Sequence, residues 1–308
     1  MCEHWRHCPG HEQTIMSVFA SFDQVTLDRE YAPSSCVDDI NTYLAEYERA
    51  SRAAKRGALK DNSCEPDIRY GAGVAETLDL FLPAQRGPAP LQVYIHGGYW
   101  QLLSKEDSCF AAPVFQRSGS YFAAVNYTLA PHQTLTGIVE ENRRAIAYLY
   151  AHADTWGFDR DRIYLSGSSA GAHLAMMLLL TDWQQVGLPR DAIKGVCAVS
   201  GVYDLEPVRL SYVNEKVGMD ASEAHKNSPI RHGLRNRCPV ILAYGDNETS
   251  EFKRQTDEYR KVLQDSGIRV SFSEIANRNH FDVIMDLAHA DTWLARQVLG
   301  QMGWRAIS

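Results

Sequence analysis

One serine of this chain lies in a pattern that suits nucleophilic catalysis. Residues 167–171 read Gly-Ser-Ser-Ala-Gly, which places Ser169 at the centre of a G-x-S-x-G motif. A β-type run, residues 162–166, precedes the motif, and an apolar helical run, residues 172–180, follows it. Glycines on either side let the chain turn sharply between strand and helix, so that the serine hydroxyl stands clear. We therefore predict that Ser169 is a nucleophile at a helix N-terminus, where free N–H groups can stabilise negative charge.

A glycine pair upstream could supply the oxyanion donors that such a serine needs. Residues 91–95 form an apolar strand-like run, and His96-Gly97-Gly98 follows directly. A loop of this type presents backbone N–H groups to a developing oxyanion, and only glycine lets the backbone come so close. We expect the oxyanion hole to consist of the N–H groups of Gly97, Gly98 and Ala170. His96 is interpreted as a residue that braces this loop rather than as a catalytic base.

The general base must follow the nucleophile in the chain if the order is serine, acid, histidine. His280 meets this condition, because it follows a β-type run at 269–275 and a polar loop at 276–279. A histidine on such a loop can reach the serine hydroxyl and act as base and then as acid. His289 competes but lies inside a helical pattern, and His132 precedes the nucleophile. We predict His280 as the catalytic histidine.

Three carboxylates compete for the acid position of the triad. They follow a strand-like run at 239–245 that ends in glycine. Glu248 is at the tip of the turn, where a long side chain can span to a neighbouring loop, and we prefer it. Asp246 remains the alternative, although it also suits a turn residue that bonds its own backbone. Glu251 suits the first turn of the next helix, where a negative charge is stabilising.

Strand and helix patterns alternate along the chain. Further strands are expected at 78–82, 121–126 and 192–200, and helices at 139–151 and 283–302. Such alternation predicts a mostly parallel sheet flanked by helices, with the catalytic loops at the carboxyl ends of the strands. The fold class is therefore α/β. The G-x-S-x-G turn between a strand and a helix, known as a nucleophile elbow, indicates an α/β-hydrolase fold, and we expect a small N-terminal helical cap.

The chain is long enough for one large domain. Its 308 residues fit a single α/β-hydrolase domain at 31–308, preceded by a loosely ordered segment at 1–30. A helical pattern at 37–57 places several apolar residues on one face, namely Ile40, Tyr43, Leu44 and Tyr47. We interpret it as the cap helix over the site.

Composition limits the partners. A formal net charge of −7, without a stripe of Lys and Arg, argues against a nucleic-acid partner. No run approaches the length of a membrane helix and no signal peptide is evident, so we expect no membrane partner. Seven cysteines without a C-x-x-C motif fit reduced thiols in the cytoplasm. The sequence leaves the oligomeric state open, with a homodimer as one option.

The first residues carry a group of potential metal ligands. Cys2, His4, His7, Cys8 and His11 lie close together, but no second half-site follows. A frayed terminus explains them better than a metal site does. We expect no metal and no cofactor.

Several longer motifs resemble those of the kynurenine formamidases (arylformamidases), a branch of the hormone-sensitive-lipase-like α/β-hydrolases. The resemblance extends from about Arg29 to the C-terminus. HGGYW at 96–100 and SGVYDLEP at 200–207 are its most specific parts, and the others are REYAPS at 29–34, ETLD at 76–79, SAGAHLA at 169–175, NSP at 227–229, SEF at 250–252 and HF at 280–281. Glu248 stands at the family's acid position, where relatives carry Asp, and Ser168 stands where the family often has His.

The resemblance implies hydrolysis of N-formyl-L-kynurenine to formate and L-kynurenine in tryptophan breakdown. Ser169 would attack the formyl carbon and His280 would protonate the departing arylamine, by way of a formyl-enzyme. The leaving-group side should be roomy and partly aromatic, with Tyr99, Trp100, Tyr203 and Phe281 as candidate substrate-binding residues. Each of these could equally be a core residue. No residue is assigned to the carboxylate or the ammonium of the substrate.

Two rival functions use the same sequence features. A general carboxylesterase for short acyl esters would need the same triad, so only relative rates on formyl-amides and esters separate the two. A non-catalytic binding module would be expected to lack a nucleophile, a histidine or an oxyanion glycine, and this sequence has all of them.

Overall fold

The centre of this computed structural model is a twisted sheet, and the structure describes residues 17–304. Within those residues the sheet has eight strands in the order β1-β2-β4-β3-β5-β6-β7-β8. The strands are β1 (Cys64–Arg69), β2 (Thr77–Phe81), β3 (Leu91–Ile95), β4 (Tyr121–Val125), β5 (Ile163–Ser168), β6 (Ile193–Val199), β7 (Val240–Asn247) and β8 (Val270–Asn279).

The sheet is mostly parallel. Strands β1 and β2 pair antiparallel with each other, and β2 pairs antiparallel with β4. Every pair from β4 through β3 to β8 is parallel. The carboxyl ends of the parallel strands therefore meet at one edge of the sheet, where ligands of α/β proteins bind. The predicted fold class, a mostly parallel sheet flanked by helices, is confirmed.

Alternation of side chains along each strand produces two hydrophobic cores. In β3, Leu91, Val93 and Ile95 contribute to one core, whereas Tyr94 contributes to the other. Successive side chains of a strand point to opposite faces, so a strand buried on both faces reads as one apolar run. The sheet is therefore covered by helices on both sides.

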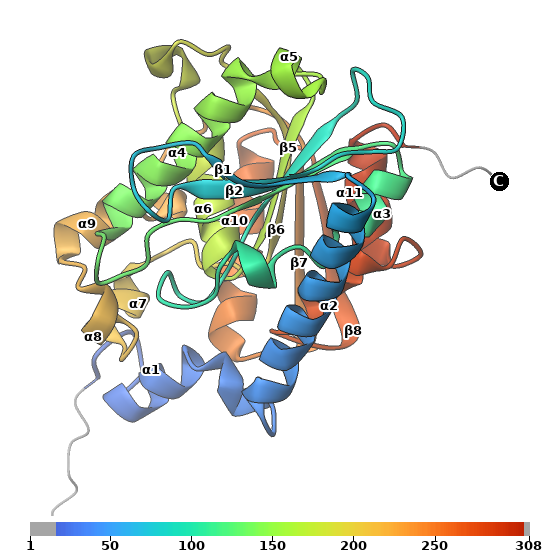
Figure 1. The fold of residues 1–308 in the computed structure, drawn as a ribbon. Coiled ribbons are helices and arrows are strands. Elements are labelled where there is room, and N and C mark those ends of the chain that lie inside the picture. The colour runs from blue at the N-terminus through green and yellow to red at the C-terminus, as the bar shows by residue number, and fades with distance from the viewer. Residues whose placement is uncertain (1–16, 305–308) are drawn as a thin grey trace, which may run out of the picture.

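Figure 1 shows α4 and α6 on one side of the sheet and α3 and α11 on the other. This agrees with the two cores, because α4 and α6 contribute to the first, and α3 and α11 to the second. The α-helices are α1 (Gln24–Glu30), α2 (Ile40–Lys60), α3 (Ala112–Arg117), α4 (Leu135–Ala151), α5 (Ala153–Trp156), α6 (Ala170–Leu179), α7 (Glu206–Leu210), α8 (Asn214–Val217), α9 (Ala221–Lys226), α10 (Ser250–Asp265) and α11 (Trp293–Gln301). The 3-10 helices are η1 (Pro33–Cys36), η2 (Lys105–Asp107), η3 (Trp183–Val186), η4 (Pro229–Arg231) and η5 (Val283–Ala288).

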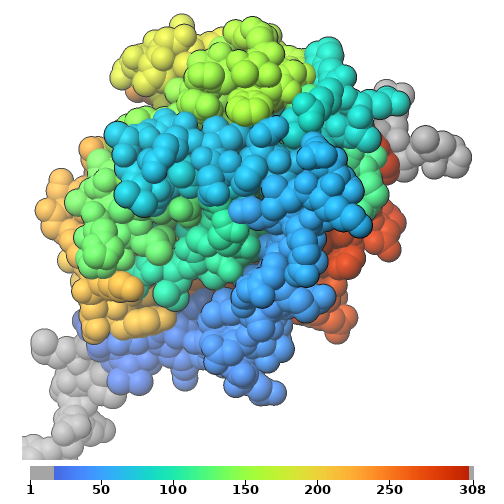
Figure 2. Space-filling view, viewed as in Figure 1, coloured from blue at the N-terminus to red at the C-terminus, as the bar shows by residue number. Residues whose placement is uncertain are grey.

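The N-terminal segment is more regular than we expected. Residues 24–30, part of the segment predicted to be loosely ordered, form α1, which begins with Asp23 accepting the Thr26 N–H. Residues 1–16, with the Cys/His group predicted to be a frayed terminus, lie outside the described residues. The expected cap helix is α2, and its first turns lie near the carboxyl ends of the strands. Figure 2 shows α1 and α2, in blue, packed against the rest of the molecule.

The predicted C-terminal helix at 283–302 is interrupted. Residues 283–288 form η5, and α11 begins only after Thr292, whose hydroxyl accepts the Ala295 N–H. His289 between them has an extended backbone and ends η5. Our expectation of one continuous helix containing His289 is therefore wrong, because a threonine N-cap starts a new helix inside the periodic pattern.

Candidate active site

Ser169 lies on a sharp turn between β5 and α6. Its backbone has φ 56° and ψ −119°, a conformation that a residue with a side chain rarely adopts. The Ser169 N–H donates to the Val199 carbonyl of β6 at 2.8 Å, which holds the turn against the neighbouring strand. A Cβ on Gly171 would overlap the Ile95 carbonyl, and one on Gly167 would overlap the Gly171 backbone. Both glycines of the motif are therefore required by close backbone packing.

The loop after β3 approaches this turn through its glycines. A Cβ on Gly97 would lie 2.7 Å from the Ser168 carbonyl, and Gly98 has φ +90° with the Leu102 carbonyl close by. In the described part of the chain, the Gly97, Gly98 and Ala170 N–H groups make no backbone hydrogen bond outside the regular bonds of helices and strands. The structure thus brings three backbone donors to the vicinity of Ser169.

His96 is buried under this loop. Its Nδ1 donates to the Gly97 carbonyl at 3.0 Å, and its ring stacks on Tyr127 with centroids 4.1 Å apart. The Tyr127 hydroxyl in turn donates to the His96 carbonyl at 2.9 Å. Burial lowers the pKa of His96 to about 4, so the ring is neutral at pH 7. These contacts stiffen the loop that carries Gly97 and Gly98.

His280 and Glu248 form a buried pair beside Ser169. The Nδ1 atom of His280 lies 2.8 Å from Oε2 of Glu248. The other oxygen, Oε1, accepts the Ser200 hydroxyl at 2.6 Å and the Gly245 N–H at 2.7 Å. Three donors therefore orient this carboxylate, and it in turn fixes the orientation of the imidazole. A carboxylate on Nδ1 leaves Nε2 as the nitrogen that can exchange a proton.

Asp246, the alternative acid, lies elsewhere. Its side chain is exposed and accepts the Arg278 N–H at 3.1 Å. A backbone hydrogen bond from Asn277 lowers its pKa. The side chain thus tethers the end of β7 to β8, and the structure brings Glu248, not Asp246, together with His280.

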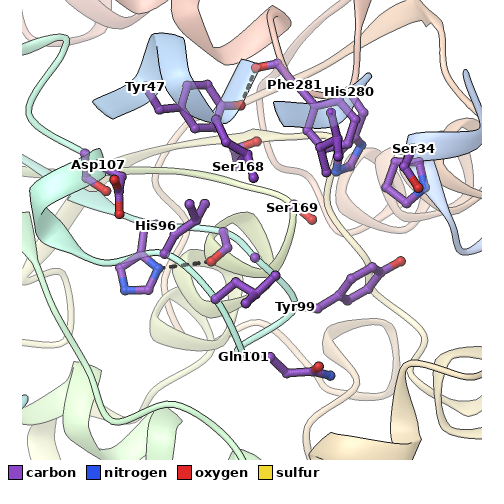
Figure 3. A pocket seen from close by; sticks show the side chains of 18 of the residues that line it. Ser34, Tyr47, His96, Tyr99, Gln101, Asp107, Ser168, Ser169, His280 and Phe281 are labelled. Carbon is purple, nitrogen blue, oxygen red and sulfur yellow. Dashed lines mark hydrogen bonds between the residues drawn. The ribbon is translucent and has the colours of Figure 1, made fainter. Parts of the chain in front are cut away.

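A cavity of about 380 Å³ opens at this edge of the sheet, and Ser169 and His280 both line it. Figure 3 shows both side chains facing this space, together with Ser168, His96 and Tyr99. Much of the remaining wall is apolar or aromatic and includes Ile40, Leu44, Tyr47, Tyr94, Phe110 and Phe281. Apolar walls with a few polar groups are typical of small-molecule sites.

Two of the four aromatic candidates line the cavity, and two do not. Tyr99 and Phe281 belong to its wall. Trp100 is fully buried and meets the His173 ring edge-on at 5.0 Å, and Tyr203 is fully buried against Tyr259 at 4.5 Å. The structure therefore does not bring Trp100 or Tyr203 to the cavity, and both pack in the core instead. A sequence cannot show on which side of a loop each of two adjacent aromatic residues will point.

The first turns of α2 supply wall residues that we did not assign to substrate binding. Ile40, Leu44 and Tyr47 lie on one helix face and reach the cavity. Their spacing of four and three residues is the signal that could have identified them, since such residues share a helix face. A solvent-facing helix would have carried polar residues there.

The N-terminal segment is tied to the loops of the site by hydrogen bonds. The Tyr99 hydroxyl donates to the Tyr31 carbonyl at 2.7 Å, and the Tyr31 hydroxyl donates to Glu251 at 2.8 Å. Thr249, next to Glu248, donates its hydroxyl to the Glu30 carbonyl at 2.6 Å. The segment before α2 therefore contacts both the oxyanion loop and the loop that carries the acid.

Three carboxylates elsewhere lie close enough to bind a cation. They are Asp67, Asp79 and Glu106, and none of the three lines the cavity of Ser169. Lys105 already pairs with Asp67 and Asp79 at 2.8 Å each, and Lys55 pairs with Asp79 at 2.6 Å. The lysines satisfy these carboxylates, so the cluster is explained as an ion-pair network. Among the helices in residues 17–304, none has both the length and the apolarity needed to cross a membrane.

Comparison with known sequences identifies close relatives. The family model described as BD-FAE matches residues 78–263. Kynurenine formamidases from Danio rerio and Salmo salar are each 34% identical to this chain, over 94% of it and 99% of their own length. The kynurenine formamidase from Drosophila melanogaster is 27% identical over 88% of this chain and 95% of its own.

Solved structures share the architecture. A Silicibacter protein described as a candidate thioesterase has a TM-score of 0.77 at 28% identity, covering 88% of this chain and 97% of its own. An esterase from Pyrobaculum calidifontis has a TM-score of 0.69 at 19% identity, covering 92% and 98%. Together with the sheet order, these likenesses confirm the predicted α/β-hydrolase fold.

Proposed function

Because this chain belongs to the kynurenine formamidase family, and to the BD-FAE family of the matching model, we propose that it hydrolyses N-formyl-L-kynurenine to L-kynurenine and formate. The observation that carries the chemistry is the meeting of three features at one cavity. These are the hydroxyl of Ser169, the His280–Glu248 pair and the donors of the oxyanion loop. The substrate is a small molecule, which a cavity of about 380 Å³ can enclose in large part.

The first half of the proposed reaction acylates Ser169. The Ser169 hydroxyl attacks the formyl carbon while Nε2 of His280 takes its proton. Glu248 stabilises the imidazolium that forms, because its Oε2 faces Nδ1 at 2.8 Å. The Gly97, Gly98 and Ala170 N–H groups then hold the negative oxygen of the tetrahedral intermediate. Removing one such donor costs on the order of 10²–10³ in turnover.

The second half releases both products. The imidazolium of His280 gives its proton to the arylamine nitrogen as the carbon–nitrogen bond breaks, which frees L-kynurenine. A water molecule, deprotonated by His280, attacks the formyl ester on Ser169. Formate leaves and Ser169 regains its proton, so the enzyme returns to its starting state.

The shape of the site supports this division of roles. A formyl group carries only hydrogen on its acyl carbon and needs no acyl pocket, whereas the leaving group is a large aryl ketone. Tyr99 and Phe281, with the face of α2 that carries Leu44 and Tyr47, line the cavity that would hold this leaving group. We also propose that α2 acts as the cap of a single domain and keeps water from the leaving group.

A second candidate function is hydrolysis of short acyl esters. Relatives named as esterases, for example esterase LipQ of Mycobacterium tuberculosis, match at 27% identity over 70% of this chain and 57% of their own. Ester and formyl-amide would use the same three catalytic side chains, so the rates on the two substrates decide between them.

We place the reaction in the cytoplasm. The cysteines of the described residues, at positions 36, 64, 109, 197 and 238, are all free thiols. Free thiols fit a reducing compartment better than an oxidising one.

The experiment is a product analysis with purified protein. We expect one formate for each L-kynurenine formed from N-formyl-L-kynurenine, and loss of both with Ser169→Ala. An unchanged rate in the variant, or no kynurenine from the wild type, would contradict the proposal.

A further inference from the structure

One carboxylate lines the cavity that Ser169 and His280 share. Asp107, the last residue of η2, belongs to the wall, and no other Asp or Glu of the described residues does. The same wall contains no Lys or Arg. Its fixed charge is therefore negative, and it is concentrated at Asp107.

Asp107 has no cationic partner among the described side chains. Its Oδ2 accepts the Ser104 hydroxyl at 3.1 Å, which leaves Oδ1 for another donor. The two nearby lysines are engaged elsewhere, since Lys105 pairs with Asp67 and Asp79 and Lys55 pairs with Asp79 and Glu106. A half-buried carboxylate that faces a cavity without a counter-ion is costly unless a ligand supplies the positive charge.

The surroundings favour a cation at this point. Burial raises the pKa of Asp107, and the negative charges of Glu48 and Glu106 raise it further. A bound ammonium group would stabilise the charged form of Asp107, whereas a carboxylate of the ligand would destabilise that form further. The wall at Asp107 thus discriminates between the two charged groups of an amino acid.

Asp107 and the catalytic histidine lie on different sides of the cavity. Figure 3 shows Asp107 on the side of the cavity away from His280 and Phe281, with Ser168 between them. Tyr47, Tyr94 and Phe110 line the same cavity and pack on one another, with Phe110 6.0 Å from Tyr47 and 5.4 Å from Tyr94. An aromatic ring held among them would direct a flexible arm away from Ser169 and towards Asp107.

We propose that Asp107 binds the ammonium group of the substrate, so that the cavity selects aryl formamides that carry a cationic arm. The inference rests on the proposed function for its substrate, but it makes a claim of its own about charge. The carboxylate on the same carbon finds no positive partner in the wall. It should contribute little to binding and lie towards solvent.

The test compares four substrates with three proteins by steady-state kinetics. The substrates are N-formyl-L-kynurenine, its decarboxylated amine, its deaminated acid and the neutral ester p-nitrophenyl acetate. The proteins are the wild type, Asp107→Asn, and Glu48→Gln as a control that removes the same charge outside the cavity. Glu48 is a largely exposed partner of Arg52, and its side chain is 56% exposed.

We expect Asp107→Asn to raise KM about tenfold or more for the two ammonium-bearing substrates, with kcat nearly unchanged. Rates on the deaminated acid and on the ester should change about twofold or less, which also shows that the variant folds. The wild type should favour the amine over the deaminated acid. Glu48→Gln, which removes a charge that acts on Asp107 only from outside the cavity, should change KM by about twofold or less for every substrate.

Two results would overturn the proposal. One is an equal loss on all four substrates, and the other is a wild type that prefers the deaminated acid to the amine.

Failure of the proposed function is a different result, namely no deformylation of any aryl formamide. In that case an ester that carries an ammonium arm replaces the formamides. If the wild type hydrolyses this ester faster than p-nitrophenyl acetate and Asp107→Asn does not, the result supports the charge assignment. If the variant keeps the preference for the ammonium-bearing ester, the result refutes it.

Discussion

At the scale of single residues, Glu248 shows how the position of a carboxylate decides its role. It lies three residues after the strand-end glycine and reaches Nδ1 of His280 while also accepting the Gly245 N–H and the Ser200 hydroxyl. Asp246 lies within β7 and accepts a hydrogen bond from the backbone of β8. A carboxylate that touches the imidazole controls its tautomer, and one that tethers a strand does not.

We predict that Glu248→Gln lowers kcat by about 10²–10⁴-fold. The amide oxygen can still accept from Gly245 and Ser200, but its NH₂ group then faces Nδ1 and favours the wrong tautomer. Asp246→Asn, the matched control, should stay within about threefold of wild type, because its role is structural. Steady-state kinetics on N-formyl-L-kynurenine distinguishes them, and loss of activity in Asp246→Asn alone would reverse the assignment.

The residue roles could be predicted only where a motif and a chain order constrain them. Ser169, His280 and Glu248 could be placed near one another because each follows a strand of a parallel sheet. Trp100 and Tyr203 could not be excluded from the site, because their orientation depends on packing against His173 and Tyr259. Asp107 gave no signal in sequence, since an acidic residue in a polar loop usually faces water.

At the scale of elements, the predicted strands were the most successful part. Residues 91–95 form β3 and residues 121–125 form β4, because strands buried on both faces read as short apolar runs. Residues 206–231 form three short helices and a 3-10 turn that no periodicity indicated. Segments of four to six residues are too short for a helical period to show.

Glycines within the elements allow a paired test of packing. We predict that Gly171→Ala lowers the free energy of unfolding by about 3 kcal/mol or more, because the new Cβ would overlap the Ile95 carbonyl. Gly57→Ala in α2 meets nothing within 4 Å and should raise it by about 0.5–1 kcal/mol. Urea unfolding of both variants measures the difference, and equal effects would contradict this packing of β5, α6 and β3.

At the scale of the whole molecule, the two cores on either side of the sheet bury histidines along with apolar residues. His96 and His173 are both buried, and burial lowers the pKa of each to about 4. Among the described residues, each ring has one nitrogen that makes no hydrogen bond, Nε2 in His96 and Nδ1 in His173. Protonation would place an unpaired N–H and a charge in the core, so the fold is more stable with both rings neutral.

This arrangement predicts acid sensitivity. In the unfolded chain a histidine titrates near 6.5, above the folded value, so the unfolded state gains protons first as the pH falls. Stability is therefore full above about pH 6.5 and is lost progressively towards pH 4, by about 2 kcal/mol for each histidine between pH 7 and 5. Urea unfolding at several pH values should show this dependence of the free energy of unfolding on pH. His173→Gln should remove the part of the dependence that is due to the protonation of one histidine. A stability that does not change between pH 7 and 5 would show that these rings are not buried neutral.

The overall architecture could be predicted further than its details. Alternating strand and helix patterns, together with the G-x-S-x-G turn between strand and helix, indicate the α/β-hydrolase fold. The patterns did not indicate α1 or the contacts that join Tyr31 to the loops of Tyr99 and Glu251, because such contacts link residues far apart in the chain. Periodicity reports local structure and says little about which distant segments meet.

The most direct test of the central claim is kcat/KM for N-formyl-L-kynurenine measured beside that for p-nitrophenyl acetate, with Ser169→Ala as the control. We predict a value for the formyl-amide that is higher by about tenfold or more, with both activities lost in the variant. Ester cleavage with negligible deformylation would contradict it in favour of a general esterase.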